Sequence, residues 1–247
     1  MGADVINNSW GDEADEACGY TPPSSQEEDA VRYATTRGVV VIFAAGNENC
    51  SIANLSPQNM PEVLTVAAID HLGQKASFSN YGSVVDVAAP GGGDSAPPSD
   101  DPEYSVLSLL AAGSILATDP LYSNLKVGTQ YVRLAGTSTS APYVAGVAAL
   151  VLGHDPQLTQ TDVRSRIIAE AIPFPVTPSV PIGSGIAIAL RPRPVASIVS
   201  YQKFPANRYV YPQEEWELSF RLLFRNFSAP FYATLSIDRP DIQIIQS

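Results

Sequence analysis

The pattern of apolar and polar positions predicts buried strands in the first half of the chain. Residues 39–45 form a continuous apolar run rich in β-branched side chains, and residues 63–69 and 84–89 repeat this pattern. A strand without apolar–polar alternation is typical of a parallel sheet that helices cover on both faces. A shorter strand is expected over residues 3–9.

A helix is predicted between the strand at 3–9 and the strand at 39–45. Ser24 and Ser25 each have a glutamate three residues later, which is the spacing of a capping box. Gly38 follows the last apolar position of this helix and is expected to end it. A strand, a helix and a second strand in this order form a βαβ unit, whose two strands are parallel.

Two further helices are predicted at residues 138–152 and 159–171, and Pro173 should end the second. Together with the strands, they indicate an α/β fold over residues 1–193. Its sheet is expected to be mainly parallel and to be flanked by helices. No segment of the chain repeats another.

Two regions depart from this pattern. Residues 91–132 begin with three glycines and an aspartate, and we interpret them as a long surface insertion with a short hairpin or a helix at 106–116. Residues 194–247 alternate apolar and polar side chains, clearly at 216–222 and less so at 231–237. This alternation predicts half-exposed antiparallel strands, and therefore the beginning of a β-rich appended domain.

The composition limits the partners of the protein. Hydrophobic residues make up 45% of the 247 residues and charged residues 16%, which is too apolar for a disordered chain. The 14 basic and 25 acidic residues give a net charge of −11, so no nucleic acid partner is expected. No run of about 18 apolar residues occurs, so no membrane span is expected. The first residues do not have the pattern of a signal peptide.

Ser138 is the strongest candidate for a reactive side chain. It lies in the segment Gly-Thr-Ser-Thr-Ser-Ala-Pro at the predicted start of a helix rich in alanine and glycine. Free backbone N–H groups and the positive end of the helix dipole favour an anion beside a hydroxyl at this position. Serine is also a favoured N-cap residue, so a purely structural cap is the alternative that this segment alone leaves open.

Residues 134–146 closely resemble the nucleophile motif of the subtilisin-like serine proteases, or subtilases. The core Gly-Thr-Ser-x-x-Ala-Pro is intact. Family members usually have Met-Ala at the positions of Thr139 and Ser140, and His at the position of Tyr143. The resemblance implies a serine endopeptidase that acts on polypeptide substrates with Ser138 as its nucleophile.

A second resemblance concerns residues 40–47, which end in Ala-Ala-Gly-Asn. They look like the strand and turn that deliver the oxyanion-hole asparagine of the subtilases, so the resemblance assigns that role to Asn47. A buried strand that ends in this way can hold a carboxamide at the edge of the sheet where ligands bind in α/β folds. The alternative is an ordinary turn residue.

A third resemblance, at the start of the chain, implies the walls of the pocket for the substrate's P1 side chain. Ser9, Trp10 and Gly11 would form one wall, and Ala45 and Gly46 the other. The two glycines are expected to leave room for an apolar side chain. Packing in the core is the alternative for Trp10. A fourth matching segment, at residues 76–91, has a mainly structural role in the family.

The Asp and His of the family's Asp-His-Ser triad have no counterpart in this chain. It contains neither Asp-Ser/Thr-Gly nor His-Gly-Thr-His, and its two histidines are His71 and His154. His154 is 16 residues beyond Ser138, about 24 Å along a helix, whereas a general base must approach to about 3 Å. His71 is expected in an exposed turn. We therefore expect that Met1 is an internal methionine of a longer, N-terminally truncated protein.

The chain by itself is accordingly expected to hydrolyse peptides barely or not at all. A non-catalytic pseudoprotease or peptide-binding fragment is the alternative function. Another serine hydrolase, such as an esterase, is less well supported, because the chain has no Gly-x-Ser-x-Gly elbow. The family resemblance implies a location outside the cytoplasm.

The remaining candidates are two cysteines and an acidic cluster. Cys18 and Cys50 fit either one disulfide or two free thiols. No cofactor is required by the proposed chemistry. Calcium is possible in the intact protein, because many subtilases bind it, and oxygen ligands occur at Asp94, Asp100, Asp101 and Glu103. Their spacing is not that of a dedicated calcium loop, so an acidic surface loop is preferred and no metal is assigned.

Overall fold

The computed structural model describes residues 2–11, 18–19, 25–93, 104–189, 195–201 and 220–225. The chain divides into two compact units, residues 1–190 and 191–247. The acidic cluster at residues 94–103 lies outside the described residues, and so does the strand predicted at 231–237.

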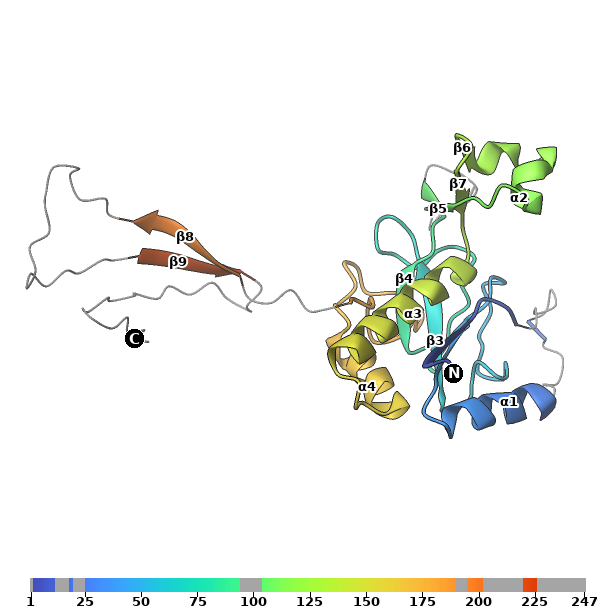
Figure 1. Cartoon of the computed structure of the whole chain (residues 1–247), viewed down its shortest axis with the longest axis horizontal. Helices are drawn as coiled ribbons and strands as arrows, with labels where there is room; N and C mark the ends of the chain where they lie inside the picture. The colour runs from blue at the N-terminus through green and yellow to red at the C-terminus, as the bar shows by residue number, and fades with distance from the viewer. Residues whose placement is uncertain are drawn as a thin grey trace, which may run out of the picture. The chain divides into compact units, whose positions relative to one another are not determined.

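The first unit is built on a sheet of four parallel strands (Figure 1), in the order β1-β2-β3-β4. The strands are β1 (Val5–Asn8), β2 (Val40–Ala44), β3 (Val63–Ile69) and β4 (Val87–Pro90). All three neighbouring pairs are parallel. The prediction of a mainly parallel sheet is therefore confirmed.

Helices cover both faces of this sheet. Helix α1 (Ser25–Thr35) packs against one face, and α3 (Thr137–His154) lies along the other, where it contacts all four strands. Helix α4 (Gln160–Glu170) packs beside α3 (Figure 1). The side chains of β2 alternate between these layers, since Ile42 joins the core under α3 and Phe43 the core under α1. Both faces of β2 are buried, which explains its uninterrupted apolar sequence.

The strand predicted at residues 84–89 is shorter and begins only at Val87. Before it, the N–H of Val85 donates to the carbonyl of Gly82 in a turn. The Asp86 carboxylate then accepts from the N–H of Thr65 at 2.9 Å and pairs with Arg164 of α4. The backbone N–H of Asp86 already donates to the carbonyl of Thr65 in β3 at 3.0 Å, so contact with the sheet begins directly after this turn.

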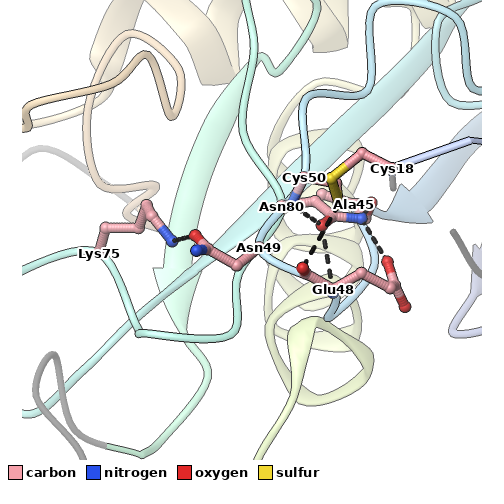
Figure 2. Close-up of a disulfide and its surroundings, with 7 residues drawn as sticks. All are labelled: Cys18, Ala45, Glu48, Asn49, Cys50, Lys75 and Asn80. Atoms are coloured by element: carbon pink, nitrogen blue, oxygen red, sulfur yellow. Dashed lines mark hydrogen bonds between the residues drawn. A yellow bond between two sulfur atoms is a disulfide. The ribbon is translucent and has the colours of Figure 1, made fainter. Parts of the chain in front are cut away.

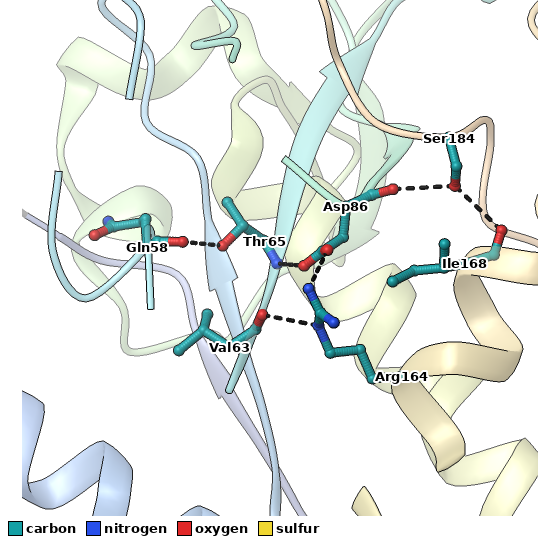
Figure 3. Close-up of polar contacts among 7 residues, drawn as sticks. All are labelled: Gln58, Val63, Thr65, Asp86, Arg164, Ile168 and Ser184. Atoms are coloured by element: carbon teal, nitrogen blue, oxygen red, sulfur yellow. Dashed lines mark hydrogen bonds and ion pairs between the residues drawn. The ribbon is translucent and has the colours of Figure 1, made fainter. Parts of the chain in front are cut away.

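Asp86 and Arg164 tie the sheet to α4 (Figure 3). Arg164 also donates from Nε to the carbonyl of Val63 at 3.2 Å, and Ser184 donates to the carbonyl of Asp86 at 3.1 Å. Burial raises the pKa of Asp86, while the bonds from Thr65 and Arg164 act in the opposite direction. Because the carboxylate is nearly enclosed, its partners decide whether it can remain charged.

The insertion predicted at 91–132 forms a small antiparallel layer. Its strands are β5 (Val106–Leu109), β6 (Lys126–Val127) and β7 (Tyr131–Leu134), in the order β5-β7-β6. Between β5 and β6 lie the short helix α2 (Ile115–Thr118) and the 3-10 helix η2 (Pro120–Leu125). For residues 106–116 the sequence was compatible with either a hairpin or a helix. The structure has the strand β5 there, followed by the start of helix α2.

The second unit contains an antiparallel pair of strands, β8 (Val195–Tyr201) and β9 (Phe220–Arg225). The register shifts between Ile198 and Ser200, which marks a β-bulge or a related irregularity. The strand predicted at 216–222 lies at 220–225 in the described part of the chain.

Candidate active site

The candidate residues lie together at one edge of the sheet, where β1 and β2 end and α3 begins. Strands β1 and β2 are parallel, with Asn8 of β1 opposite Phe43 of β2, so the segments that follow them leave the sheet at the same edge. Helix α3 begins at this edge with Thr137. A cavity of about 140 Å³ opens there, and its lining consists of Ser9, Trp10, Gly11, Ala44, Gly46, Asn47, Glu48, Gln58, Thr137 and Ser138.

Ser138 is half-buried in the first turn of α3 and exchanges hydrogen bonds with Ser9. Its Oγ donates to the carbonyl of Ser9 at 3.3 Å, and the Ser9 Oγ donates to the carbonyl of Ser138 at 2.8 Å. The backbone N–H groups of a first helical turn have no acceptor within the helix. The N–H of Ser138 can therefore serve a negatively charged oxygen at the cavity.

The carboxamide of Asn47 has a defined orientation. Its Oδ1 accepts from the N–H of Thr137 at 2.8 Å and from the Thr137 hydroxyl at 3.0 Å. The same hydroxyl accepts from the N–H of Gly46 at 3.0 Å. Within the described ranges, Asn47 Nδ2 has no hydrogen-bond partner. Because the oxygen faces two donors, the NH₂ group is the free end of the carboxamide.

Ala45 is the one predicted wall residue that does not line the cavity. It is fully buried with Ile52 and Ala67 in a core cluster, and Ala44 takes its place at the cavity. Successive side chains of an extended segment point to opposite sides, so the two alanines cannot both face the cavity. The side chain of Ala45 therefore faces away from this cavity.

Trp10 lies at the cavity and also reaches the core. It is 52% exposed, and its ring meets the ring of Phe43 edge to face, with centroids 5.3 Å apart. Trp10 therefore both lines the cavity and packs against the core residue Phe43.

Sequence reasoning missed Gln58 and Glu48 as lining residues. Gln58 is 2% exposed, and its Nε2 donates weakly to the carbonyl of Ala44 at 3.4 Å. A Cβ at Gly11 would collide with this amide, so the glycine leaves room for a side chain from within the protein. The amide and the Glu48 carboxylate make the lining more polar than the apolar pocket expected from the glycines. Nothing in the residues around Gln58 signals this position.

A disulfide joins Cys18 and Cys50 next to this cavity (Figure 2). Their Cα atoms are 5.5 Å apart, and 32 positions separate them in the sequence. Cys50 follows Asn47 by three residues, and Cys18 lies on the segment that continues from Gly11. Of the two arrangements that the sequence left open, the structure has the disulfide.

The two histidines lie away from the cavity lining. His71 is exposed in the turn after β3, and its ring stacks on Tyr104 with centroids 4.0 Å apart. His154 is the last residue of α3, at the opposite end from Ser138. Among the described residues, no group of three or more His, Cys, Asp or Glu side chains could hold a metal ion.

Comparison with known proteins identifies the family. The family model described as "Subtilase family", Peptidase_S8, matches residues 1–203. The chain belongs to the subtilase family. The resemblance inferred from the residues around Ser138 and Asn47 is confirmed, and the serine proteases are the class of enzyme to which the relatives of this chain belong.

Proteases of two bacteria are similar to this chain over most of its length. A probable subtilase-type serine protease of Deinococcus radiodurans is 38% identical over 181 residues, which cover 69% of this chain and 21% of the relative. An extracellular protease of Xanthomonas campestris is 35% identical over 188 residues, which cover 76% of this chain and 28% of the relative. The chain thus spans about a quarter of the length of these relatives.

Solved structures of proteases share the fold. A protease of Pseudoalteromonas arctica is 36% identical with a TM-score of 0.60, and the match covers 76% of this chain and 49% of that one. A cold-adapted subtilisin-like serine proteinase is 27% identical with a TM-score of 0.55, covering 77% of this chain and 56% of that one. Within the described residues, no helix is both long and apolar enough to cross a bilayer.

Proposed function

We propose that this polypeptide supplies the nucleophile, the oxyanion hole and part of the substrate cleft of a serine endopeptidase. Ser138 Oγ would attack the carbonyl carbon of the scissile peptide bond. The negative charge that develops on the carbonyl oxygen would be held by Asn47 Nδ2 and by the backbone N–H of Ser138.

The observation that supports this proposal best is that Ser138 and Asn47 line one cavity at the N-terminus of α3. The nucleophile and a carboxamide donor come from segments about 90 residues apart, and the donor's oxygen is bound to Thr137, the residue before the nucleophile. A stabilised oxyanion requires donors that are oriented before the reaction begins.

The proton of Ser138 needs a base that these residues do not offer. In the structure the hydroxyl donates to the carbonyl of Ser9, and a peptide carbonyl is too weak a base to remove the proton at neutral pH. His154 lies at the far end of α3, about 24 Å away by helical rise. We propose that an Asp–His pair outside these 247 residues handles the proton, and that this polypeptide alone has little or no peptidase activity.

A non-catalytic, peptide-binding protein is the second candidate function. The absence of the Asp and His motifs from the sequence favours it. In that case the cavity would still hold an extended peptide next to Ser9 and Gly46, but Ser138 and Asn47 would not contribute to any turnover.

The proposed substrates are polypeptides, and the proposed location is outside the cytoplasm. The name of the Xanthomonas relative, an extracellular protease, supports the location. The Cys18–Cys50 disulfide supports it independently, because disulfides persist in oxidising compartments.

Hydrolysis of an activated peptide ester by the 247-residue chain tests the proposal. A good leaving group reduces the need for a base, so the contribution of the oxyanion hole can be measured alone; serine proteases that lack one triad member keep roughly 10³-fold catalysis over water. We expect an ester rate above buffer that Ser138→Ala lowers only slightly, because residual catalysis by the oxyanion hole does not require the serine hydroxyl. Asn47→Leu should lower it by roughly 10² to 10³, the loss observed for the equivalent donor of a subtilisin. An ester rate indifferent to Asn47→Leu would favour the peptide-binding function.

A further inference from the structure

Asn80 occupies the centre of the turn that presents Asn47. We call residues 45–50 the Asn47 turn. Asn80 is fully buried, and all four hydrogen-bonding positions of its carboxamide are directed at this turn (Figure 2). Its Nδ2 donates to the carbonyl of Ala45 at 2.9 Å and to Glu48 Oε2 at 2.6 Å. Its Oδ1 accepts from the N–H groups of Glu48 at 3.2 Å and Cys50 at 2.7 Å.

These contacts fall on both sides of Asn47. Ala45 precedes it, whereas Glu48 and Cys50 follow it, and the backbone N–H of Asn80 donates to the carbonyl of Gly46 at 3.0 Å. A carboxamide offers two donors and two acceptor positions, and here none remains for water. The Asn47 turn is therefore folded around one side chain that belongs to another segment.

The backbone of the turn depends on this arrangement. Gly46 has φ of 98°, in the region that favours glycine, and a Cβ at this position would collide with Asn80 Nδ2. Asn49, with φ of 54°, is one of the few non-glycine residues with a positive φ. Its N–H donates to the carbonyl of Phe78 at 2.8 Å, so the segment around Asn80 also holds the second unusual backbone position.

We infer that Asn80 is a positioning residue for the oxyanion hole. Asn47 is exposed, and its own side chain hydrogen-bonds only to Thr137 among the described residues. The place of its Cα is set by the turn, and Asn80 is the side chain that joins the two halves of that turn. This inference rests on the proposed role of Asn47, since a preorganised donor is useful only where an oxyanion forms.

The N–H of Thr137 provides a readout that does not touch Asn80. This N–H donates to Asn47 Oδ1, and its rate of hydrogen exchange reports whether the Asn47 carboxamide is in place. The N–H of Val66, in the middle of β3, serves as the reference for global unfolding. A positioning effect raises exchange at Thr137 alone, whereas a general loss of stability raises both.

Reversing one hydrogen bond gives the sharpest test. Asn80→Asp replaces Nδ2 by an oxygen that faces both the carbonyl of Ala45 and the Glu48 carboxylate. Two hydrogen bonds are lost, and we expect Thr137 exchange to rise by roughly tenfold or more relative to Val66. Glu48→Gln in that background supplies an NH₂ donor to the new carboxylate. We expect the double variant to recover about half of this loss on a logarithmic scale, because one of the two hydrogen bonds is regained in the opposite direction while the carbonyl of Ala45 remains without its donor.

Ser79→Ala is the matched control. Ser79 is as buried as Asn80 and adjacent to it, but its hydroxyl bonds to Ala68 and to the carbonyl of Asn80 rather than to the Asn47 turn. This variant should leave the ratio of Thr137 to Val66 exchange unchanged. If Asn80→Asp does not fold, Asn80→Ser introduces no charge and is expected to raise the same ratio.

Two results would overturn the inference. One is a Thr137 exchange rate that follows Val66 in every Asn80 variant, and the other is a double variant no better protected than Asn80→Asp. Neither result concerns the role of Asn47 in chemistry, which the ester assay tests. Conversely, an ester rate that does not depend on Asn47 would contradict the proposed oxyanion-hole function. Hydrogen exchange at Thr137 would still show whether Asn80 positions the Asn47 turn.

Discussion

Asn47 and Thr137 are joined by two hydrogen bonds, from the Thr137 N–H and from its hydroxyl, both to the carboxamide oxygen of Asn47. The second bond depends on a hydroxyl that is completely buried and that also accepts from the N–H of Gly46. Thr137 therefore connects the start of α3 to the turn after β2, and it decides which end of the Asn47 carboxamide is free.

Thr137→Val should lower the ester rate more than Thr137→Ser. Valine has the shape of threonine but leaves the N–H of Gly46 without an acceptor, a loss of about 1 to 3 kcal/mol in the free energy of unfolding. Denaturant unfolding measures this loss. The ester assay measures the fall in hydrolysis rate that follows when the Asn47 carboxamide is held less firmly. A valine variant with wild-type ester turnover would show that the Thr137 N–H alone orients Asn47.

Arg164→Met should destabilise the first unit by about 3 kcal/mol, because it leaves the Asp86 carboxylate buried without its cation. Urea unfolding gives the value directly. Arg166→Met is the control, since the Arg166–Glu170 pair is more exposed and lies within one helix, where a pair contributes about 0.3 to 0.5 kcal/mol. Equal losses for the two variants would contradict a special role of the buried pair.

The stability of the protein should depend on pH through Lys75. Its ammonium donates to Asn49 Oδ1 at 2.8 Å and to the carbonyl of Ser79 at 2.7 Å. Burial lowers the pKa of Lys75 from 10.5 to about 8. Between these pH values the unfolded chain binds the proton that the folded chain has released, so the free energy of unfolding should rise with pH in this window.

Lys75→Met provides the comparison for this effect. The difference in free energy of unfolding between wild type and variant should shift in favour of wild type from about pH 8 to pH 10, and should be constant at lower pH, where both states are protonated. Unfolding by urea at a series of pH values measures it. A difference that is flat across this range would mean that Lys75 remains charged when the protein is folded.

Removal of the disulfide should lower stability without abolishing the fold. Cys18 and Cys50 are 32 positions apart, and closing a loop of this size is worth about 3 to 4 kcal/mol in the chain-entropy model. Replacing both cysteines by serine and measuring the unfolding midpoint tests this value. Mass spectrometry that finds two free thiols in protein from its native source would contradict the pairing itself.

The sequence by itself determined the layout of the first unit. The uninterrupted apolar run at residues 39–45 is a local property, because a strand buried on both faces has no polar positions to alternate. The helix at 159–171 was also predicted from the sequence. Its start depends on local contacts, because the capping box is formed by Thr159 and Asp162, only three positions apart. The motifs at Ser138 and Asn47 were visible for a similar reason: each is a short segment whose backbone conformation demands particular residues.

Only the tertiary structure decided how these segments cooperate. Parallel strands bring residue 47 beside residue 137, and nothing local to either segment specifies that contact. Gln58 beneath Gly11, and Asn80 at the centre of the Asn47 turn, are ordinary polar residues in the sequence. Their roles arise because the Gln58 NH₂ group and both ends of the Asn80 carboxamide are buried and bond to the groups that the packing of the whole sheet places beside them.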